Sequence, residues 1–308
     1  MFLFIILEVL VPILLLILLG VVLQIKFEFD LRQFSALITY CLMPASVFVN
    51  ILNVNIKADV LLQIIYYVVL YSIILIIFSH IICKFLKLNP GQDAALKNSI
   101  SLMNSGNYGL PVSNLIFSHN PIGVIGVSIQ VFILIFQNLL TYTYGIYNIL
   151  STTKTFKEII ISFLRLPVFH ALILGIIFNY FKLSLPKPIL LPLNHLADAF
   201  IAIALIVLGA QLAKIKINFF QRVITWSLVG RLIVGPALSL ALIYLLHIDG
   251  IVAQSLFIAS SFPTSRNTST IAMEYQVEPE LHAQIVLFST LLSAITVTTV
   301  IYLSYILF

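Results

Sequence analysis

The sequence predicts an all-α polytopic membrane protein with ten transmembrane helices. Hydrophobic residues make up 61% of the 308-residue chain, charged residues make up 9%, and long apolar segments follow one another with short connections. Soluble domains carry about 25% charged residues, so the composition excludes an ordinary soluble domain. The net charge of +5 comes from cations in short loops, which orient a membrane protein and give no support to nucleic-acid binding.

Ten candidate spans follow from the apolar segments, since roughly 20 helical residues cross a bilayer. They cover residues 1–25, 31–53, 59–83, 96–118, 122–148, 163–182, 189–213, 222–246, 251–273 and 282–307. The first lacks a basic region and a small-residue cleavage site, so we expect a retained helix rather than a signal peptide. No motif of a metal enzyme, an ATPase or a hydrolase is present. We therefore expect no enzymatic activity, no metal and no cofactor.

Lysine and arginine predict the orientation, because they mark the cytoplasmic side. If the N-terminus is outside, three cations lie in outer loops: Lys57, Lys182 and Lys187. Eleven then lie in or beside inner loops: Lys26, Arg32, Lys84, Lys87, Lys97, Lys154, Lys157, Arg165, Lys214, Lys216 and Arg222. We expect a multi-pass protein of the cell membrane with both termini extracellular and the longest connection, 149–162, in the cytoplasm.

The middle of the fourth span has the amino-acid composition of a turn. Asn104, Gly106, Asn107, Gly109 and Pro111 fall within eight residues, and glycine and proline both disfavour a helix interior. Hydrocarbon cannot satisfy the freed backbone groups, so such a break needs protein or a polar cavity around it. A discontinuous helix with a midplane binding site is the sharper interpretation. A kinked helix packed through its glycines is the alternative.

The ninth span is interrupted in the same way, by Pro263, Arg266 and Asn267. An arginine at mid-span must face protein, water or a charged partner. Two proline-broken spans in corresponding places predict crossed half-helices around a carrier site.

An internal repeat supports this correspondence. The Pro-x7-Gly pattern of Pro12–Gly20 recurs at Pro167–Gly175, an offset of 155 residues, and Pro111 and Pro263 are offset by 152. An odd number of spans in each half forces the halves into opposite orientations. We therefore expect a 5+5 inverted repeat, with repeats over 1–148 and 163–308 joined by the loop 149–162.

Several motifs together resemble the auxin efflux carrier family. The G-N-x-G-x-P signature is matched at residues 106–111, and further matches are Pro44, Leu208-Gly209, Arg231-Leu232 with Pro236, Pro263 with Asn267, and Glu274-Tyr275 with Pro279-Glu280. The resemblance implies a scaffold domain and a transport domain with crossed helices four and nine, as in the bile-acid symporter-like and NhaA-like architecture. It also implies carriage of an organic anion, since the plant PIN-formed members export auxin and bacterial relatives are described as malate or malonate permeases. Arg266 departs from the family, where many members carry a neutral residue.

The candidate substrate-binding residues lie at the two breaks: Asn104, Gly106, Asn107, Gly109, Pro111, Asn114, Pro263, Arg266 and Asn267. Asparagine amides both donate and accept, so they suit a ligand, although they could instead only cap the half-helices. Arg266 could bind a carboxylate in a two-pronged manner, or pair with a fixed acid such as Asp198. We expect Arg231 to form a structural pair or to snorkel.

Candidates for ion coupling are the ionisable residues within spans: Asp198, Glu8, His170 and His195. His170 could instead be a hydrogen-bonded packing residue. Neither break contains an acidic residue, which favours proton-coupled or uncoupled transport over sodium coupling.

The sequence thus predicts a secondary active transporter for small organic anions such as mono- or dicarboxylates. A sodium-coupled anion symporter and a membrane sensor that binds its ligand without transport are the alternatives. The expected partners are the organic anion, the lipid bilayer and a second copy of the chain in a homodimer.

Overall fold

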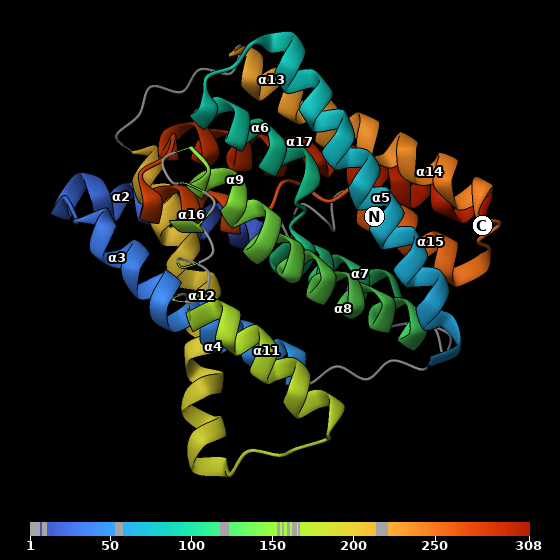
Figure 1. Cartoon of the computed structure of the whole chain (residues 1–308), viewed down its shortest axis with the longest axis horizontal. Coiled ribbons are helices and arrows are strands. Elements are labelled where there is room, and N and C mark those ends of the chain that lie inside the picture. Colours follow the sequence, from blue (N-terminus) through green and yellow to red (C-terminus); the bar gives the residue numbers. More distant parts are fainter. Residues whose placement is uncertain are drawn as a thin grey trace.

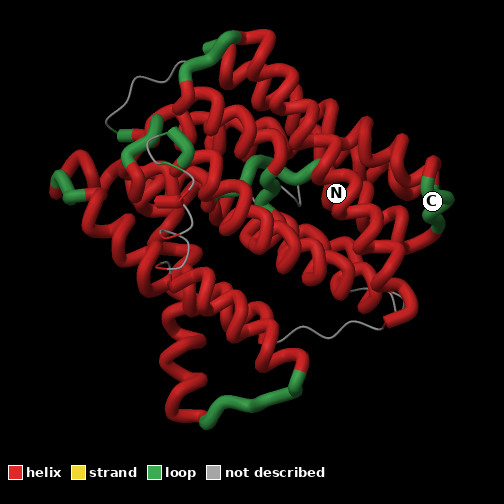
Figure 2. Tube along the Cα trace, viewed as in Figure 1, coloured by secondary structure: helices red, strands yellow, loops and turns green. Residues whose placement is uncertain are grey.

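The computed structural model describes residues 7, 11–52, 58–117, 123–152, 155, 157–158, 161, 165, 167–213 and 221–308. Over these ranges the regular structure is helical, and the only β-type pairing is an isolated bridge between Met103 and Thr264. Figure 2 shows helices joined by short loops, with loop segments also in the interior of the molecule. The prediction of an all-α protein is confirmed over the described ranges.

Five stretches of the described chain are long and apolar enough to cross a bilayer, namely Leu62–Leu86, Ile125–Leu150, Lys187–Ala210, Arg222–Leu245 and Pro279–Leu307. They lie in α5 (Ala58–Leu86), in the run α8 (Gly123–Leu140), η4 (Thr141–Gly145) and α9 (Ile146–Leu150), in α12 (Lys187–Leu212), in the run α13 (Arg222–Val229), η5 (Gly230–Val234) and α14 (Gly235–Leu245), and in α17 (Pro279–Leu307). The shorter helices include α2 (Val11–Phe27), α11 (Pro167–Tyr180) and the run α3 (Leu31–Leu37), η2 (Ile38–Leu42) and α4 (Met43–Leu52). The chain is a multi-pass membrane protein.

Two of the predicted spans are interrupted helices. α6 (Pro90–Ser101) stops where Leu102 becomes extended, with φ −110° and ψ 119°, and helix resumes in η3 (Ser105–Gly109) and α7 (Leu110–Phe117). The break at residues 102–104 therefore precedes the glycine–proline cluster. Pro111 lies in α7 directly after the π-helical turn η3, so the helix is interrupted before the proline and not at it.

The second interruption separates α15 (Gly250–Ser260) from α16 (Asn267–Tyr275). In Figure 1 the halves of each interrupted helix lie on opposite sides of the centre of the molecule. α16 ends where Gln276 adopts the left-handed conformation with φ 54°, and Pro279 begins α17.

The helices pack in two groups, and each group contains parts of both sequence halves. In the first, which we call the small bundle (α2, α4, α11 and α12), α12 packs along α2 and α4 while α11 packs along α4. Figure 1 shows α4, α11 and α12 together in the lower part of the view. The second, the crossing bundle (α5–α8 and α13–α17), contains most of the larger hydrophobic core. The predicted division into two sequence repeats is a different division, which this packing does not test.

Within the small bundle, α2 and α12 are in backbone contact. A Cβ on Gly20 would lie 2.0 Å from the carbonyl oxygen of Ile206, and a Cβ on Gly209 would lie 1.9 Å from that of Ile17. Only glycine permits this approach at the two positions. Gly20 ends the Pro-x7-Gly repeat pattern, and Gly209 belongs to the Leu-Gly motif of the family resemblance. Both motifs therefore lie at the contact between α2 and α12.

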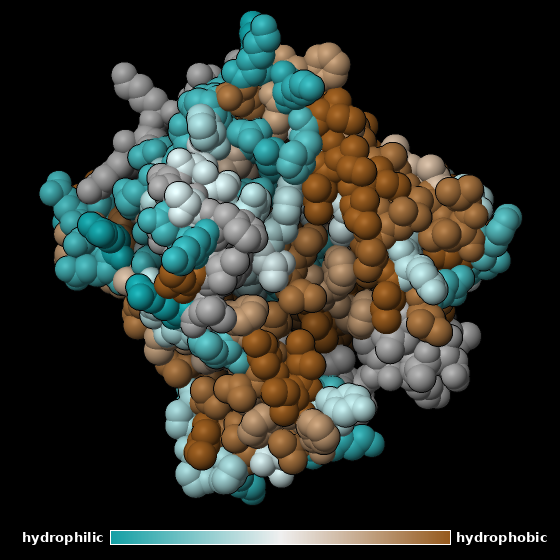
Figure 3. All heavy atoms as spheres, in the orientation of Figure 1, coloured by the Kyte–Doolittle hydropathy of each residue, from teal (hydrophilic) through white to brown (hydrophobic). Residues whose placement is uncertain are grey.

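The outer surface of the helices is apolar. Large exposed side chains include Tyr66 and Phe85 on α5, Ile177 on α11 and Leu191 on α12. Figure 3 shows hydrophobic residues over the right and lower parts of one face, with hydrophilic residues gathered at the upper left and at the tips. Such a surface fits a lipid environment.

Candidate functional site

The two interrupted helices cross at their extended segments. The amide of Asn104 donates to the carbonyl oxygen of Pro263 at 2.8 Å, and the amide of Ser265 donates to that of Leu102 at 2.9 Å. The two hydrogen bonds form an antiparallel bridge. Each break therefore supplies partners for backbone groups that the other break frees, which avoids the cost of leaving them unpaired within a membrane.

Two glutamine side chains of α8 bind the first break. Gln137 Oε1 accepts the amide N–H of Met103 at 3.1 Å, and Gln130 Nε2 donates to the carbonyl oxygen of Ser105 at 2.7 Å. Both side chains are buried, with at most 4% of their surface exposed. The extended conformation is thus held by fixed partners on a neighbouring helix as well as by the second break.

Arg231 of η5 joins the C-terminal ends of α6 and α15, the first halves of the two interrupted helices. Its guanidinium donates to the carbonyl oxygens of Ile100 at 2.9 Å and Ser260 at 2.5 Å, and to the hydroxyl of Tyr71 at 2.9 Å. One cation therefore faces the negative dipole ends of both α6 and α15. The side chain is fully buried, so it does not snorkel. Its partners among the described residues are carbonyl and hydroxyl oxygens and not the acid of an ion pair.

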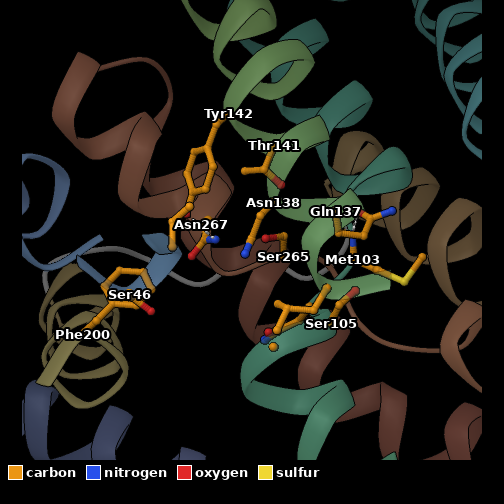
Figure 4. Close-up of a pocket in the computed structure, with 14 residues that line it drawn as sticks. Ser46, Met103, Ser105, Gln137, Asn138, Thr141, Tyr142, Phe200, Ser265 and Asn267 are labelled. Atoms are coloured by element: carbon orange, nitrogen blue, oxygen red, sulfur yellow. Dashed lines mark hydrogen bonds between the residues drawn. The ribbon is translucent and has the colours of Figure 1, made fainter. Parts of the chain in front are cut away.

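A polar cavity of about 40 Å³ lies beside the crossing, between the crossing bundle and the small bundle. It is lined by Met103, Asn104, Ser105, Gly106, Ser265 and Asn267 of the two breaks, by Leu134, Gln137, Asn138, Thr141 and Tyr142 of α8 and η4, and by Ser46, Val47 and Phe200 of the small bundle. Figure 4 shows the side chains of Asn138, Ser265 and Asn267 close together in the middle of the view. None of the described lining residues is acidic or basic, so their hydrogen-bonding groups are neutral amides and hydroxyls.

Two helices begin at the cavity, because Ser105 opens the run η3–α7 and Asn267 opens α16. A helix N-terminus carries about +0.5 of a charge, and at the start of α16 the amides of Thr268 and Ser269 already donate to the carbonyl oxygens of Ser265 and Arg266. The hydroxyl of Ser105 is buried and has no hydrogen-bond partner in the described part of the chain. Asn267 Nδ2 donates to the Tyr142 hydroxyl at 3.2 Å. The cavity therefore combines a positive field with hydrogen-bonding groups, which suits an anion.

Arg266 lies behind the wall of this cavity with only 1% of its surface exposed. Its Nη1 donates to the carbonyl oxygen of Ile201 at 3.0 Å, its Nη2 lies 3.5 Å from Asn267 Oδ1, and its guanidinium carbon lies 4.6 Å from the ring centroid of Phe200. Asp198, the fixed acid considered from sequence, is exposed on α12 and forms no ion pair with Arg266. Within the described residues, Arg266 is a buried cation without a counter-charge.

Two known proteins similar to this chain are named as transporters. Residues 151–302 match the family model described as "Membrane transport protein". The chain is 30% identical over 148 residues to the "Putative malonate transporter" of Rhizobium meliloti, covering 45% of each chain. It is 27% identical over 147 residues to an uncharacterized transporter of Methanocaldococcus jannaschii, covering 46% of this chain and 47% of the relative. The matches thus span about half the length of each relative. These matches support a membrane transport protein of the auxin efflux carrier family.

Three of the predicted site residues line the cavity: Asn104, Gly106 and Asn267. Arg266 contacts two residues of the wall, Asn267 and Phe200. Three others have backbones in η3 and α7, while their side chains fall outside the described part of the structure: Asn107, Pro111 and Asn114.

Two predicted site residues support the crossing without lining the cavity. Pro263 is buried and acts through its carbonyl oxygen in the bridge. Gly109 packs against the second break, since a Cβ there would lie 2.5 Å from both the Phe262 ring and Gln130 Nε2. Both act on the shape of the site through the backbone.

The ion-coupling candidates are not brought to the cavity. Glu8 lies outside the described residues. Asp198 and His195 are exposed on α12, and His170 is exposed on α11, where its ring packs edge-on against Phe169. None of these three lines the cavity.

Sequence reasoning from helix-breaking residues missed the fifth span as a wall of the site. Gln137, Asn138, Thr141 and Tyr142 come from a continuous helix that contains no break. A signal was present, because the pair Gln137-Asn138 interrupts the apolar run I-L-I-F-Q-N-L-L. Polar side chains at that depth usually face a polar interior.

Proposed function

We propose that this protein is a secondary active transporter for small organic anions and that the cavity at the crossing is its binding site. The observation that carries the proposal is the positive electrostatic field at the cavity. Two helix N-termini open at a cavity lined by neutral amides and hydroxyls, and directly behind its wall lies a buried arginine that has no counter-charge in the described part of the chain. An anion is the ligand that such a field stabilises. The name of the malonate-transporter relative supports the same class of ligand.

We propose further that the chain forms ten spans as a 5+5 inverted repeat with both termini extracellular. The interrupted helices support this arrangement, because they occupy corresponding places in the two halves and meet in an antiparallel bridge. The shared cap by Arg231 supports it too, since one side chain serves the equivalent ends of α6 and α15.

Alternating access would arise from movement of the crossing bundle against the small bundle. The cavity lies between them, and its volume of about 40 Å³ is far below that of a typical ligand pocket, about 300–1,000 Å³. A dicarboxylate therefore needs Ser46 and Phe200 of the small bundle to move away from the crossing. The crossing itself is held by the bridge, Arg231 and the α8 glutamines, so we expect it to move as one unit.

Uptake of labelled malonate into proteoliposomes tests this function. The variants Asn138→Ala and Asn267→Ala each remove a cavity amide, while Asn179→Ala removes one from α11 outside the cavity and serves as the control. Loss of a hydrogen bond to a charged ligand costs about 1.5–3 kcal/mol, which is about 10- to 150-fold in affinity. We expect uptake by the wild type and the control, and loss in the two cavity variants.

Parallel arms with and without sodium, and across a pH gradient, identify the coupling. We expect no sodium dependence, because the cavity lining contains no carboxylate among the described residues. Wild-type protein that takes up no carboxylate in any arm contradicts the proposed function.

A further inference from the structure

We propose that Phe200 is a positioning residue that holds the guanidinium of Arg266 away from the cavity until an anionic substrate draws it in. The inference rests on the proposed function, since it requires an anion at the crossing. Phe200 belongs to α12 of the small bundle, is 5% exposed and lines the cavity, whereas Arg266 is 1% exposed and does not line it. The guanidinium carbon lies 4.6 Å from the centre of the ring. The phenyl group thus forms the wall in front of the charge.

The contacts that hold Arg266 leave much of its hydrogen-bonding capacity unused. A guanidinium has five N–H donors in a planar fork. Here Nη1 has one carbonyl partner, Nη2 has a long 3.5 Å contact to Asn267, and Nε has no partner. A carboxylate accepts two such donors side by side and forms a stronger bond than a neutral acceptor or an aromatic ring. An anion in the cavity would therefore outcompete Phe200 for this side chain.

The contacts of Arg266 link the crossing bundle to the small bundle, so a change of its partners affects how the two bundles move. The Phe200 ring and the Ile201 carbonyl oxygen, which both hold the guanidinium, belong to the small bundle. Arg266 itself immediately precedes α16 of the crossing bundle. When the guanidinium turns to a substrate carboxylate, a contact between the two bundles is lost. Binding of the anion and release of the bundles become one event, and a neutral analogue of the same shape would not cause it.

The test measures malonate affinity of purified full-length protein by calorimetry while the ring at position 200 is changed. Phe200→Leu removes the cation–π contact but keeps an apolar side chain, so malonate should bind about 2- to 30-fold more tightly. Phe200→Trp strengthens the contact, so malonate should bind more weakly than to the wild type. The matched control is Phe48→Leu, since Phe48 of α4 is 8% exposed and packs on the Phe178 ring at 5.6 Å within the small bundle. Its malonate affinity should not change.

Two further binding measurements, of malonamide to the variants and of malonate to the wild type, separate this proposal from a structural role and from the proposed function. Malonamide, the neutral analogue, should bind the Leu and Trp variants with equal affinity. The proposal is overturned if Phe200→Leu binds malonate with unchanged or lower affinity while the wild type binds it. It is also overturned if the Leu and Trp variants shift the affinity in the same direction. A wild type that binds no carboxylate overturns the proposed function, and this inference with it.

Discussion

Replacing Arg231 by glutamine removes the donor that the two first half-helices share. In the wild type this side chain caps the carbonyl oxygens of Ile100 and Ser260 and donates to the Tyr71 hydroxyl, with no exposure to solvent. A buried acceptor left without a donor costs about 1–3 kcal/mol, so the two carbonyls together should cost about 2–6 kcal/mol of unfolding free energy. Glutamine has a single amide and is too short to serve both. Tyr71→Phe leaves both carbonyls capped and should cost about 1.5–3 kcal/mol, the worth of one bond to a charged group.

The assay is chemical unfolding in mixed micelles followed by circular dichroism, with malonate uptake measured on the same preparations. We expect Arg231→Gln to be less stable than Tyr71→Phe, and Arg231→Lys to be intermediate because it keeps the charge but not the fork of donors. An Arg231→Gln variant at least as stable as Tyr71→Phe would refute the reasoning. Arg231 would then not hold the two half-helix ends together.

Three further predictions concern packing and orientation. Gly109→Ala places a Cβ 2.5 Å from the Phe262 ring, so it should lower the unfolding free energy by about 1–3 kcal/mol, measured in the same micelles; an unchanged value would show that the two breaks do not pack closely there. Gly209→Ala places a Cβ 1.9 Å from the Ile17 carbonyl oxygen, so α2 and α12 must separate and size-exclusion chromatography should show little monodisperse protein. Ser151→Cys, at an exposed position in the predicted cytoplasmic connection, should react with an impermeant maleimide only in inside-out vesicles. Reaction in right-side-out vesicles would reverse the predicted orientation.

Local chemistry made the helices and their interruptions predictable. Composition predicts a helical membrane protein because a bilayer admits helices whose backbone bonds are internal. The clusters around Pro111 and Pro263 predict interruptions because glycine and proline weaken a helix wherever it is placed. The position of the first break was less accessible, since the extended residues are 102–104 and the cluster itself re-enters helix. Tertiary partners such as Gln137 decide that boundary, and no local preference encodes them.

The walls of the site depended on contacts between distant segments. Asn104, Gly106 and Asn267 were predictable because they flank the breaks. Phe200 was not, because one phenylalanine of an apolar helix looks like any other until the fold sets it against Arg266. The direction in which Arg266 points was equally hidden, since its partner Ile201 lies 65 residues earlier in the chain.

The most direct test of the central claim is the position of a bound substrate analogue. Crystals grown with bromomalonate, which carries an anomalous scatterer on its central carbon, would locate the anion in an electron-density map. The proposed anion site predicts the bromine peak in the cavity between Asn138, Ser265 and Asn267, with the Arg266 guanidinium turned from Phe200 toward a carboxylate. A bromine peak elsewhere in protein that still transports malonate would contradict the assignment of the crossing as the anion site.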